Sequence, residues 1–332
     1  MYDIITIGTA AIDYIISINS GKRGGKLIFK TGQKYHIDTP IMRSGGGALN
    51  AAVTCARSGL STALVSEWGA DASGVFLENV VRAEHIHTHV TISRKKPTAT
   101  SLIFVSPDGE RTIFGSRGAL ANFSLTDIPL KNVQNAKWAY ITTGMWSPSL
   151  VEKLVRMLVK ARVSVAVSPS GYLLEQGQKA LMPLLKISDV IIMNRDEASL
   201  LTGIPASQTK KVFTRLDELV RGIVVMTDSA RGATVSDGAR MFAGKAFDAR
   251  AIDETGAGDA FGGAFIAGLI ESGERCGKRI CSEEAITYAL RRASANACSV
   301  VEHYGATEGI LTKKDFLNNK RWKKYLVKIT HL

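Results

Sequence analysis

The stretch DETGAGDAF, residues 253–261, places an acid directly after three small residues at the start of an apolar segment. Glycines permit a tight turn and a close approach to a ligand, and the first amides of a helix have no partner within it. If the amides of Gly256, Ala257 and Gly258 form such a nest, they can stabilise a phosphoryl group during its transfer. Asp259 could then accept the proton of the attacking hydroxyl and position its oxygen. The alternative is an ordinary helix start, with Asp259 stabilising the helix dipole.

Two other polar segments each follow a predicted strand, and ligands of parallel sheets bind beyond the carboxyl ends of strands. In NRDE, residues 194–197, Asn194 could reach a phosphate. Glu197 could hold Mg²⁺ through water, because this ion keeps much of its hydration shell. The alternative is a helix cap in which Glu197 is the third-position partner of Asn194. TDSARG, residues 227–232, offers a hydroxyl and small residues to a nucleotide phosphate, or is an ordinary turn.

The elements that must position these residues alternate between strand and helix. Alternation at this spacing predicts one doubly wound α/β domain over residues 1–332, with a mostly parallel sheet and helices on both faces. The predicted strands cover residues 3–8, 62–66, 137–144, 163–167, 189–194 and 222–227, and the clearest helices cover 45–60 and 149–162.

Two segments, 14–43 and 87–117, interrupt this alternation with β-forming residues and no helix. Within the second, SLIFVSPDGERTIF predicts a hairpin that turns at Pro107, Asp108 and Gly109. We expect the two insertions to form a small antiparallel sheet that acts as a lid and excludes water from a site. Because exposed sheet edges are often paired with another chain, we also expect a homodimer through the lid.

The composition is that of a globular protein, with 45% apolar and 22% charged residues in 332. No apolar run reaches the roughly 18 residues of a membrane span, and the apolar start lacks the basic first segment of a signal peptide. The net charge of +12 suits anionic ligands, but much of the excess lies in 313–328, which we expect to be the solvated face of a terminal helix. We therefore expect no specific nucleic-acid partner and no membrane partner.

The cysteines are Cys55, Cys276, Cys281 and Cys298, and none of them forms a CxxC pair. Nothing else in the sequence indicates secretion, so a reducing compartment is the default. We expect four free thiols and a cytoplasmic protein.

The motifs taken together resemble those of the ribokinase-like (PfkB) carbohydrate kinase family. DETGAGDAF is similar to the C-terminal signature DTxGAGD, and NRDE is similar to NxxE. GGGALNAAVTCARSG followed by LSTALVSEWG is similar to the N-terminal signature, with Asn50, Gly59 and Gly69 at matching distances. GTAAID, residues 8–13, is similar to the strand-end glycine and aspartate of the family. The resemblance covers nearly the whole chain, and four motifs in the family's order are far more specific than any one.

The resemblance implies a sugar kinase that uses ATP and Mg²⁺, of the ribokinase, fructokinase or ketodeoxygluconate kinase type. Asp259 would be the catalytic base, and the amides of Gly256, Ala257 and Gly258 would form the anion hole. The implied sugar-binding residues are Asp13, Gly46, Gly47, Asn50 and Trp146. The implied nucleotide-binding residues are Asn194, Thr227, Ser229, Arg231, Gly232, Gly258 and Ser294. Glu197 would serve Mg²⁺, and a potassium-like ion would lie near Asp253, Thr255, Val300, His303, Gly305 and Gly309.

The chain departs from the family's pattern at four positions. Ser229 stands where the nucleotide turn TxGxxG has its first glycine, and Glu254 stands where the C-terminal signature often has threonine. Ribokinase itself has a lysine at the place of Gly47 and a glutamate near Trp146. These last two changes argue against simple equivalence to ribokinase, so kinase chemistry is better supported than any one sugar.

Two other functions stay open. One is a nucleoside kinase of the same family, in which Met145, Trp146 and Phe114 offer an apolar face to a base; the alternative for these side chains is a role in the core. The other is a catalytically silent sugar or nucleotide sensor, which the presence of Asp259, Asn194 and Glu197 opposes.

Three further patterns carry little weight. HIHTH places His85, His87 and His89 on one face of a possible strand, but no carboxylate or cysteine cluster is positioned to complete a metal shell. GGGALN does not satisfy GxGxxG, so hydride transfer with a dinucleotide is not predicted. The sequence also lacks GxxxxGK[ST], so the nucleotide is not expected in a P-loop.

Overall fold

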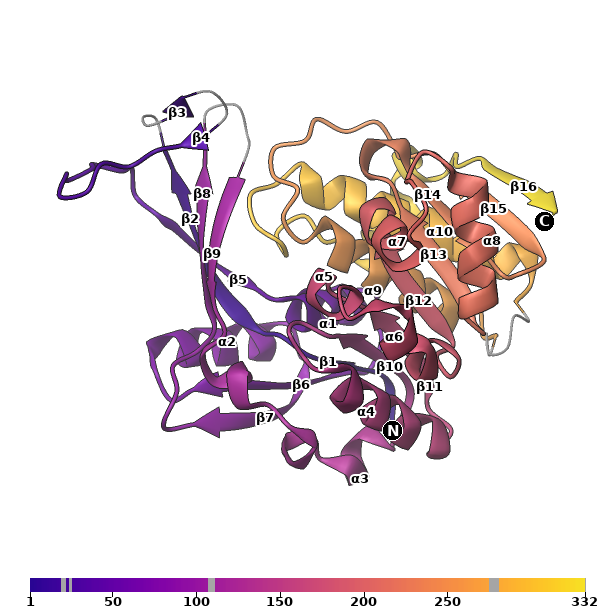
Figure 1. Cartoon of the computed structure of the whole chain (residues 1–332), viewed down its shortest axis with the longest axis horizontal. Coiled ribbons are helices and arrows are strands. Elements are labelled where there is room, and N and C mark those ends of the chain that lie inside the picture. Colours follow the sequence, from indigo (N-terminus) through magenta and orange to yellow (C-terminus); the bar gives the residue numbers. More distant parts are fainter. Residues whose placement is uncertain (19–21, 24–25, 107–110, 275–280, 332) are drawn as a thin grey trace.

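The computed structural model describes residues 1–18, 22–23, 26–106, 111–274 and 281–331, which form a large sheet between helices and a small sheet beside it (Figure 1). In spatial order the ten strands of the large sheet are β16 (Val327–His331), β15 (Arg240–Gly244), β14 (Ala233–Ser236), β13 (Ile223–Thr227), β12 (Val190–Asn194), β11 (Ser164–Ser168), β10 (Ala136–Thr142), β1 (Tyr2–Ile7), β6 (Thr62–Gly69) and β7 (His87–Ser93). Every neighbouring pair from β13 to β7 is parallel, and the pairs from β13 to β16 are antiparallel.

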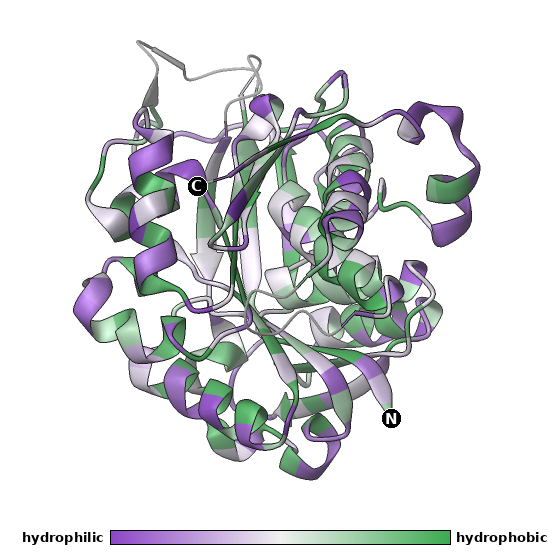
Figure 2. Cartoon of the chain, turned by 90° about the vertical axis from the view of Figure 1, so that its right-hand side faces the viewer, coloured by the Kyte–Doolittle hydropathy of each residue, from purple (hydrophilic) through white to green (hydrophobic). Residues whose placement is uncertain are grey.

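Helices cover both faces of this sheet, as the alternation predicted. The α-helices are α1 (Gly47–Arg57), α2 (Ala72–Ala83), α3 (Leu130–Val133), α4 (Pro148–Lys160), α5 (Gly171–Leu174), α6 (Gly177–Leu185), α7 (Arg195–Thr202), α8 (Thr209–Leu219), α9 (Ala257–Glu271), α10 (Glu283–Val301) and α11 (Lys313–Asn318). On one face α4, α6, α7 and α8 share a core with Ile5 and Ile7 of β1, and on the other α1, α9 and α10 share a core with Ile4. Figure 2 shows the resulting hydrophobic interior and the hydrophilic outer surfaces of the helices.

The small sheet has the order β5-β2-β8-β9 and stands away from the large one (Figure 1). It consists of β2 (Ala11–Ser17), β5 (Ile41–Gly45), β8 (Thr100–Val105) and β9 (Arg111–Ser116). The predicted hairpin is present as the antiparallel pair β8 and β9, and its predicted turn lies outside the described residues. A short pair, β3 (Lys22–Arg23) and β4 (Lys26–Leu27), lies near it.

Two features of the small sheet differ from the expectation. β2 and β8 pair in parallel, although the other pairings are antiparallel. The segment predicted to enter the small sheet from residue 87 begins with β7, which instead pairs with β6 at the edge of the large sheet. Period-2 alternation marks a strand but does not say which sheet it joins.

The prediction of a single terminal helix over 313–328 is wrong. Helix α11 ends at Asn318, a turn of 3-10 helix covers Lys320–Trp322, and β16 then pairs antiparallel with β15. Val327 and Ile329 alternate with lysine and threonine and pack against the core, which is the period of a strand. The many lysines of this segment therefore obscured the alternating pattern of an edge strand.

The expectation of free thiols holds for Cys55 and Cys298, which are both buried. It is wrong for Cys281, which is disulfide-bonded. Cys276 lies outside the described residues. Among the helices of the described part of the chain, none is long and apolar enough to span a membrane.

Candidate active site

The centre of the candidate site is the start of α9. Gly256 caps this helix in the left-handed region, with φ of 75°. A Cβ at this position would also lie 2.4 Å from the Cβ of Ala306, so both the backbone and the space require glycine. Helix α9 is buried from Ala260 to Leu269, and Asp259 lies in its first turn. The first turn of this buried helix thus carries both unpaired N-terminal amides and one carboxylate.

A second helix start lies directly against Asp259. Asn50 of α1 donates from Nδ2 to Oδ2 of Asp259 at 2.9 Å. A Cβ on Gly47, the first residue of α1, would lie 2.9 Å from Oδ1 of Asp259. Burial raises the pKa of Asp259, and the hydrogen bond from Asn50 partly offsets that rise. Glycine at position 47 is therefore what allows the carboxylate to approach α1 so closely.

Asp13 of β2 is buried beside Gly45, next to the glycines that begin α1. A Cβ on Gly45 would lie 2.0 Å from Oδ2 of Asp13, and Gly46 has φ of 93°. Burial is the main cause that raises the pKa of Asp13, and the charges of Asp259 and Asp253 raise it further. The structure therefore brings Asp13, Gly46, Gly47, Asn50 and Asp259 together, as the motifs predicted from widely separated positions.

Two buried polar atoms in this region have no hydrogen-bond partner among the described residues, Oδ1 of Asn50 and Oγ1 of Thr142. Thr142 ends β10, and its Cβ would lie 3.1 Å from a Cβ on Gly47. Unsatisfied buried polar atoms are costly unless a ligand or water completes them. Thr142 was not expected from any motif, although it lies at the carboxyl end of a central strand, where ligands of parallel sheets bind.

Asn194 and Glu197 form the capping box that was the alternative explanation for NRDE. The backbone N–H of Asn194 donates to Oε2 of Glu197 at 2.7 Å, and that of Glu197 donates to Oδ1 of Asn194 at 2.9 Å. The same pair also lies near the start of α9. Asn194 lines a pocket beside that helix, and the charge of Asp259 raises the pKa of Glu197, after burial as the main cause. The two explanations are therefore compatible.

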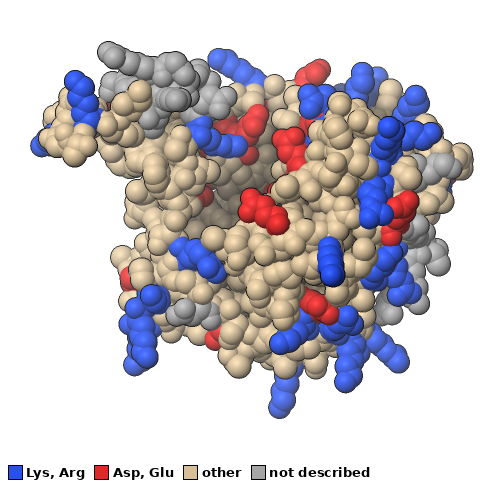
Figure 3. Space-filling view, viewed as in Figure 1, with Lys and Arg blue, Asp and Glu red and all other residues tan. Residues whose placement is uncertain are grey.

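Asp13, Asp259 and Glu197 make this part of the molecule acidic. Within the part of the chain that the structure describes, none of the three carboxylates forms an ion pair with lysine or arginine. Figure 3 shows acidic side chains at the rim of the hollow between the small sheet and the body. No three metal-ligating side chains of the described residues come together, but Mg²⁺ bound through waters needs only one or two carboxylates. The acidic residues thus fit a hydrated Mg²⁺.

A pocket of about 460 Å³ opens beside the start of α9. Its apolar wall includes Phe247, Phe261, Ala297 and Val301, which suits a flat heterocycle next to polar groups. Six of the expected nucleotide-binding residues line it: Asn194, Thr227, Ser229, Gly232, Gly258 and Ser294.

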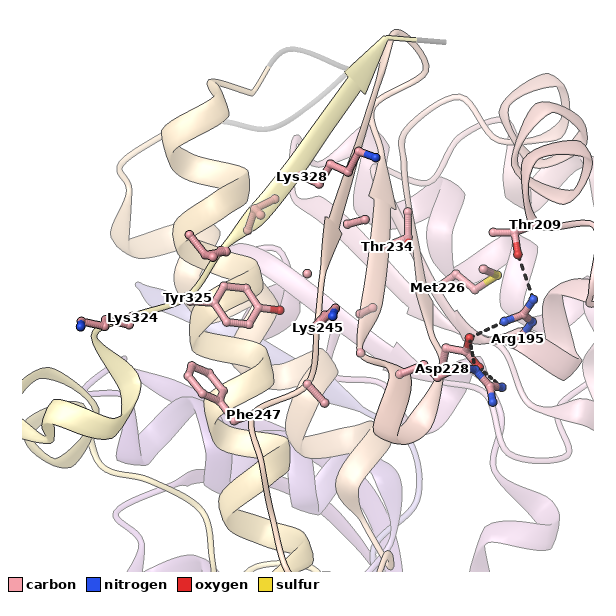
Figure 4. A pocket seen from close by; sticks show the side chains of 18 residues that line it. Arg195, Thr209, Met226, Asp228, Thr234, Lys245, Phe247, Lys324, Tyr325 and Lys328 are labelled. Carbon is pink, nitrogen blue, oxygen red and sulfur yellow. Dashed lines mark hydrogen bonds and ion pairs between the residues drawn. The ribbon is translucent and has the colours of Figure 1, made fainter.

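Arg231 is the exception among the expected nucleotide-binding residues, because it does not line this pocket. Its guanidinium binds both oxygens of Asp228, at 2.8 and 2.6 Å. Asp228 also forms an ion pair with Arg195. Figure 4 shows this pair on one side of a second pocket, with Lys324 and Tyr325 on the opposite side. Arg195 is in turn held by Thr209 at 2.9 Å. In this structure Arg231 therefore fixes the loop rather than facing the nucleotide pocket.

The expected cation-binding residues are already engaged with each other. Oδ1 of Asp253 accepts from the backbone N–H of Thr255 at 2.9 Å and its hydroxyl at 2.6 Å, and Oδ2 accepts from the backbone N–H of Gly305 at 3.0 Å. The carbonyl of Val300 accepts from the backbone N–H of His303 at 3.0 Å. A Cβ on Gly309 would lie 2.7 Å from Nδ1 of His303, so this loop is tightly packed. The side-chain oxygens of Asp253 therefore already accept hydrogen bonds within this loop.

Trp146 is part of the hydrophobic core rather than of an open surface. It is 5% exposed and stacks on Phe123 with ring centroids 4.7 Å apart. Phe114 is 57% exposed and pairs with Leu102 across the small sheet. Ser101, the neighbour of Leu102, pairs with Asp13. Because successive residues of a strand point to opposite faces, Phe114 lies on the face of the small sheet opposite to Asp13. Of the three residues considered for a nucleoside base, only Met145 is both exposed and not on that outer face.

The fold and the site define an α/β enzyme with a glycine-cradled carboxylate beside an apolar pocket. Residues 2–313 match the model of the pfkB family of carbohydrate kinases. The chain therefore belongs to the pfkB carbohydrate kinase family. It is 28% identical over 319 residues to a ribokinase from Haemophilus influenzae, covering 95% of this chain and 97% of that protein.

Solved structures agree on the fold. An adenosine kinase from Sinorhizobium meliloti superposes with a TM-score of 0.80 at 22% identity, over 94% of this chain and 97% of that one. A ribokinase from Arabidopsis thaliana, solved with ribose and ATP, superposes with a TM-score of 0.77 at 23% identity, over 97% and 99% of the two chains. The ribokinase-like α/β fold predicted from the motifs is thereby confirmed.

The backbone of Ser229 yields a prediction. This exposed serine has φ of 48°, a left-handed conformation that costs a side chain about 1 kcal/mol relative to glycine. We expect Ser229→Gly to stabilise the protein by about that amount in urea unfolding. Ser207→Gly, at an exposed serine outside the left-handed region, is the control and should be neutral or destabilising. Equal destabilisation by both substitutions would contradict the prediction.

Proposed function

We propose that this enzyme transfers the γ-phosphoryl group of ATP to a hydroxyl of a free sugar. The observation that carries the proposal is the placement of Asp259 at the N-terminus of α9, hydrogen-bonded to Asn50 at 2.9 Å and next to the pocket that Gly258 and Asn194 line. A general base, an anion-stabilising helix start and a pocket for the donor are the parts that phosphoryl transfer requires.

The chemistry assigned to this chain's residues follows from their positions. Asp259 accepts the proton of the attacking hydroxyl, and burial favours this because it raises the pKa of that carboxylate. The amides at the start of α9 stabilise the charge on the moving phosphoryl group. Asp13, Oδ1 of Asn50 and Oγ1 of Thr142 supply hydrogen-bond partners for the sugar hydroxyls. Glu197 would hold Mg²⁺ through water, and that ion would neutralise phosphate charge.

A sugar is favoured over a nucleoside by the composition of the site. The polar atoms without partners lie next to Asp259, whereas Trp146 is in the core and Phe114 lies on the outer face of the small sheet. The similarity to proteins named ribokinase supports the same choice, and the likeness to an adenosine kinase keeps a nucleoside as the second candidate. The cytoplasmic location stays a prediction, and the disulfide at Cys281 removes part of its support.

The test is ADP formation from ATP and MgCl₂ with a panel of free sugars, including ribose and fructose, and of nucleosides. Turnover with sugars and not with nucleosides is expected. Turnover with nucleosides alone would establish the second candidate. A folded protein that forms no ADP with any member of a broad panel would contradict the proposal.

The substitution Asp259→Asn separates catalysis from stability. We expect turnover to fall about a hundredfold or more, because the base is removed while the amide can still accept from Asn50. Because the pKa of Asp259 is raised in the folded protein, folding favours the protonated carboxyl group over the ionised one. The free energy of unfolding gained from this group is therefore present at low pH and is lost as the pH rises through the raised pKa. The variant should therefore melt at an equal or higher temperature than wild type near neutral pH. Near-normal turnover would exclude Asp259 as the base.

We also propose a homodimer formed through the outer face of the small sheet. Leu102 is 39% and Phe114 57% exposed there, and Phe104 contacts Phe114 with ring centroids 5.6 Å apart. Large exposed apolar residues in a row indicate an interaction surface. The charge substitution Phe114→Glu should give a monomer in sedimentation velocity. Leu326→Glu, at a residue of the body that is 90% exposed, is the control and should stay dimeric. A monomeric wild type at micromolar concentration would refute the dimer.

A further inference from the structure

Arg111, the first residue of β9, connects the small sheet to the loop that leads into α9. Its Nη1 donates to the hydroxyl of Thr255 at 2.8 Å and to Oδ1 of Asp253 at 3.2 Å. Gly115, four residues along the same strand, pairs with Ser101, which pairs with Asp13. Arg111 therefore lies on the face of the small sheet that carries Asp13, toward the active site.

The contacts of Arg111 occupy the side-chain oxygens that the family resemblance gives to a monovalent cation. Oδ1 of Asp253 already accepts from Thr255, and Oδ2 accepts from Gly305 at 3.0 Å. The guanidinium completes this set, and Asp253 has no other lysine or arginine partner among the described residues. A monovalent cation on Asp253 and Thr255 would find their side-chain oxygens already occupied by hydrogen bonds. It would also be repelled by the positive charge of the Arg111 guanidinium.

The position of this ion pair matters for the anion hole. Thr255 immediately precedes Gly256, whose left-handed backbone starts α9. The negative charge of Asp253 also affects the candidate site, because it raises the pKa of Asp13. Burial and the charge of Asp259 are the larger causes of that rise. A guanidinium held on Asp253 and Thr255 both fixes the loop before the amides and reduces the negative charge that an incoming phosphate would meet.

We propose that Arg111 is a positioning residue that stands in place of a monovalent cation and holds the anion hole in shape when the small sheet covers the site. It acts through Asp253 and Thr255 and touches neither substrate. The role rests on the proposed phosphoryl transfer. The enzyme should accordingly work without potassium, and a potassium-responsive site should arise when the guanidinium is removed.

The chain supplies a matched control. Arg43 of β5 also forms an ion pair between the small sheet and a C-terminal loop, with its Nε 2.7 Å from Oε1 of Glu308. Among the described residues, neither Arg43 nor Glu308 forms a hydrogen bond with Asp253 or Thr255. Arg43→Ala therefore weakens the attachment of the small sheet without removing charge from the loop before α9.

The first experiment needs no substrate. Thermal unfolding is compared in KCl and in tetramethylammonium chloride at equal ionic strength. Wild type and Arg43→Ala should show no potassium-specific shift, whereas Arg111→Ala should melt at a higher temperature in KCl because its freed oxygens bind the ion. A potassium-specific shift in wild type, or its absence in Arg111→Ala, would overturn the proposal.

The second experiment is kinetic and uses an accepted sugar. Without potassium, Arg111→Ala should lose about tenfold to a hundredfold in kcat with the KM for ATP little changed, because the anion hole is misplaced and the pocket is not. KCl should restore part of that loss, Arg111→Lys should keep more activity than Arg111→Ala, and Arg43→Ala should resemble wild type. Unchanged kcat in Arg111→Ala would overturn the role. If wild type phosphorylates nothing, the proposed function fails, and the melting comparison still decides the cation replacement.

Discussion

The structure depends on the close approach of Asp259 to the first turn of α1. The carboxylate accepts a hydrogen bond from Asn50 at 2.9 Å and leaves no space for a side chain at Gly47. Burial of a carboxylate in this way is unfavourable for its charged form and raises its pKa. A fold keeps such an arrangement when a reaction uses it, and a general base for a hydroxyl is the use that the surrounding groups support.

The large sheet and the buried helix α9 serve this approach. A Cβ on Gly263 would lie 3.0 Å from Thr54 of α1, and one on Gly268 would lie 2.6 Å from the Cα of Ala289 in α10. These glycines let three helices pack closely on one face of the sheet, which fixes the N-terminus of α9 against that of α1. The small sheet contributes Asp13 from one strand and Arg111 from another, so the charges around the start of α9 depend on where this sheet lies.

Much of the fold and of the site could be predicted from the sequence, because both are encoded locally. Apolar strands alternate with amphipathic helices, and the glycine and acid of each motif lie where strands end. The errors arose where the decisive partner is distant in sequence. The lysines of 313–328 hide the alternation of β16, β7 could have joined either sheet, and the burial of Trp146 depends on Phe123. The contact of Arg111 with Asp253 likewise joins residues 142 positions apart and carries no local signal.

The central claim is that Asp259, with a pKa raised by burial, is the base in phosphoryl transfer. The most direct measurement is the single-turnover rate of phosphoryl transfer as a function of pH. The rate should fall on acidification with one ionisation, as the base becomes protonated, and its midpoint should lie above the ordinary pKa of an aspartate side chain. A rate that stays constant from neutral pH down to the onset of acid unfolding would contradict the account.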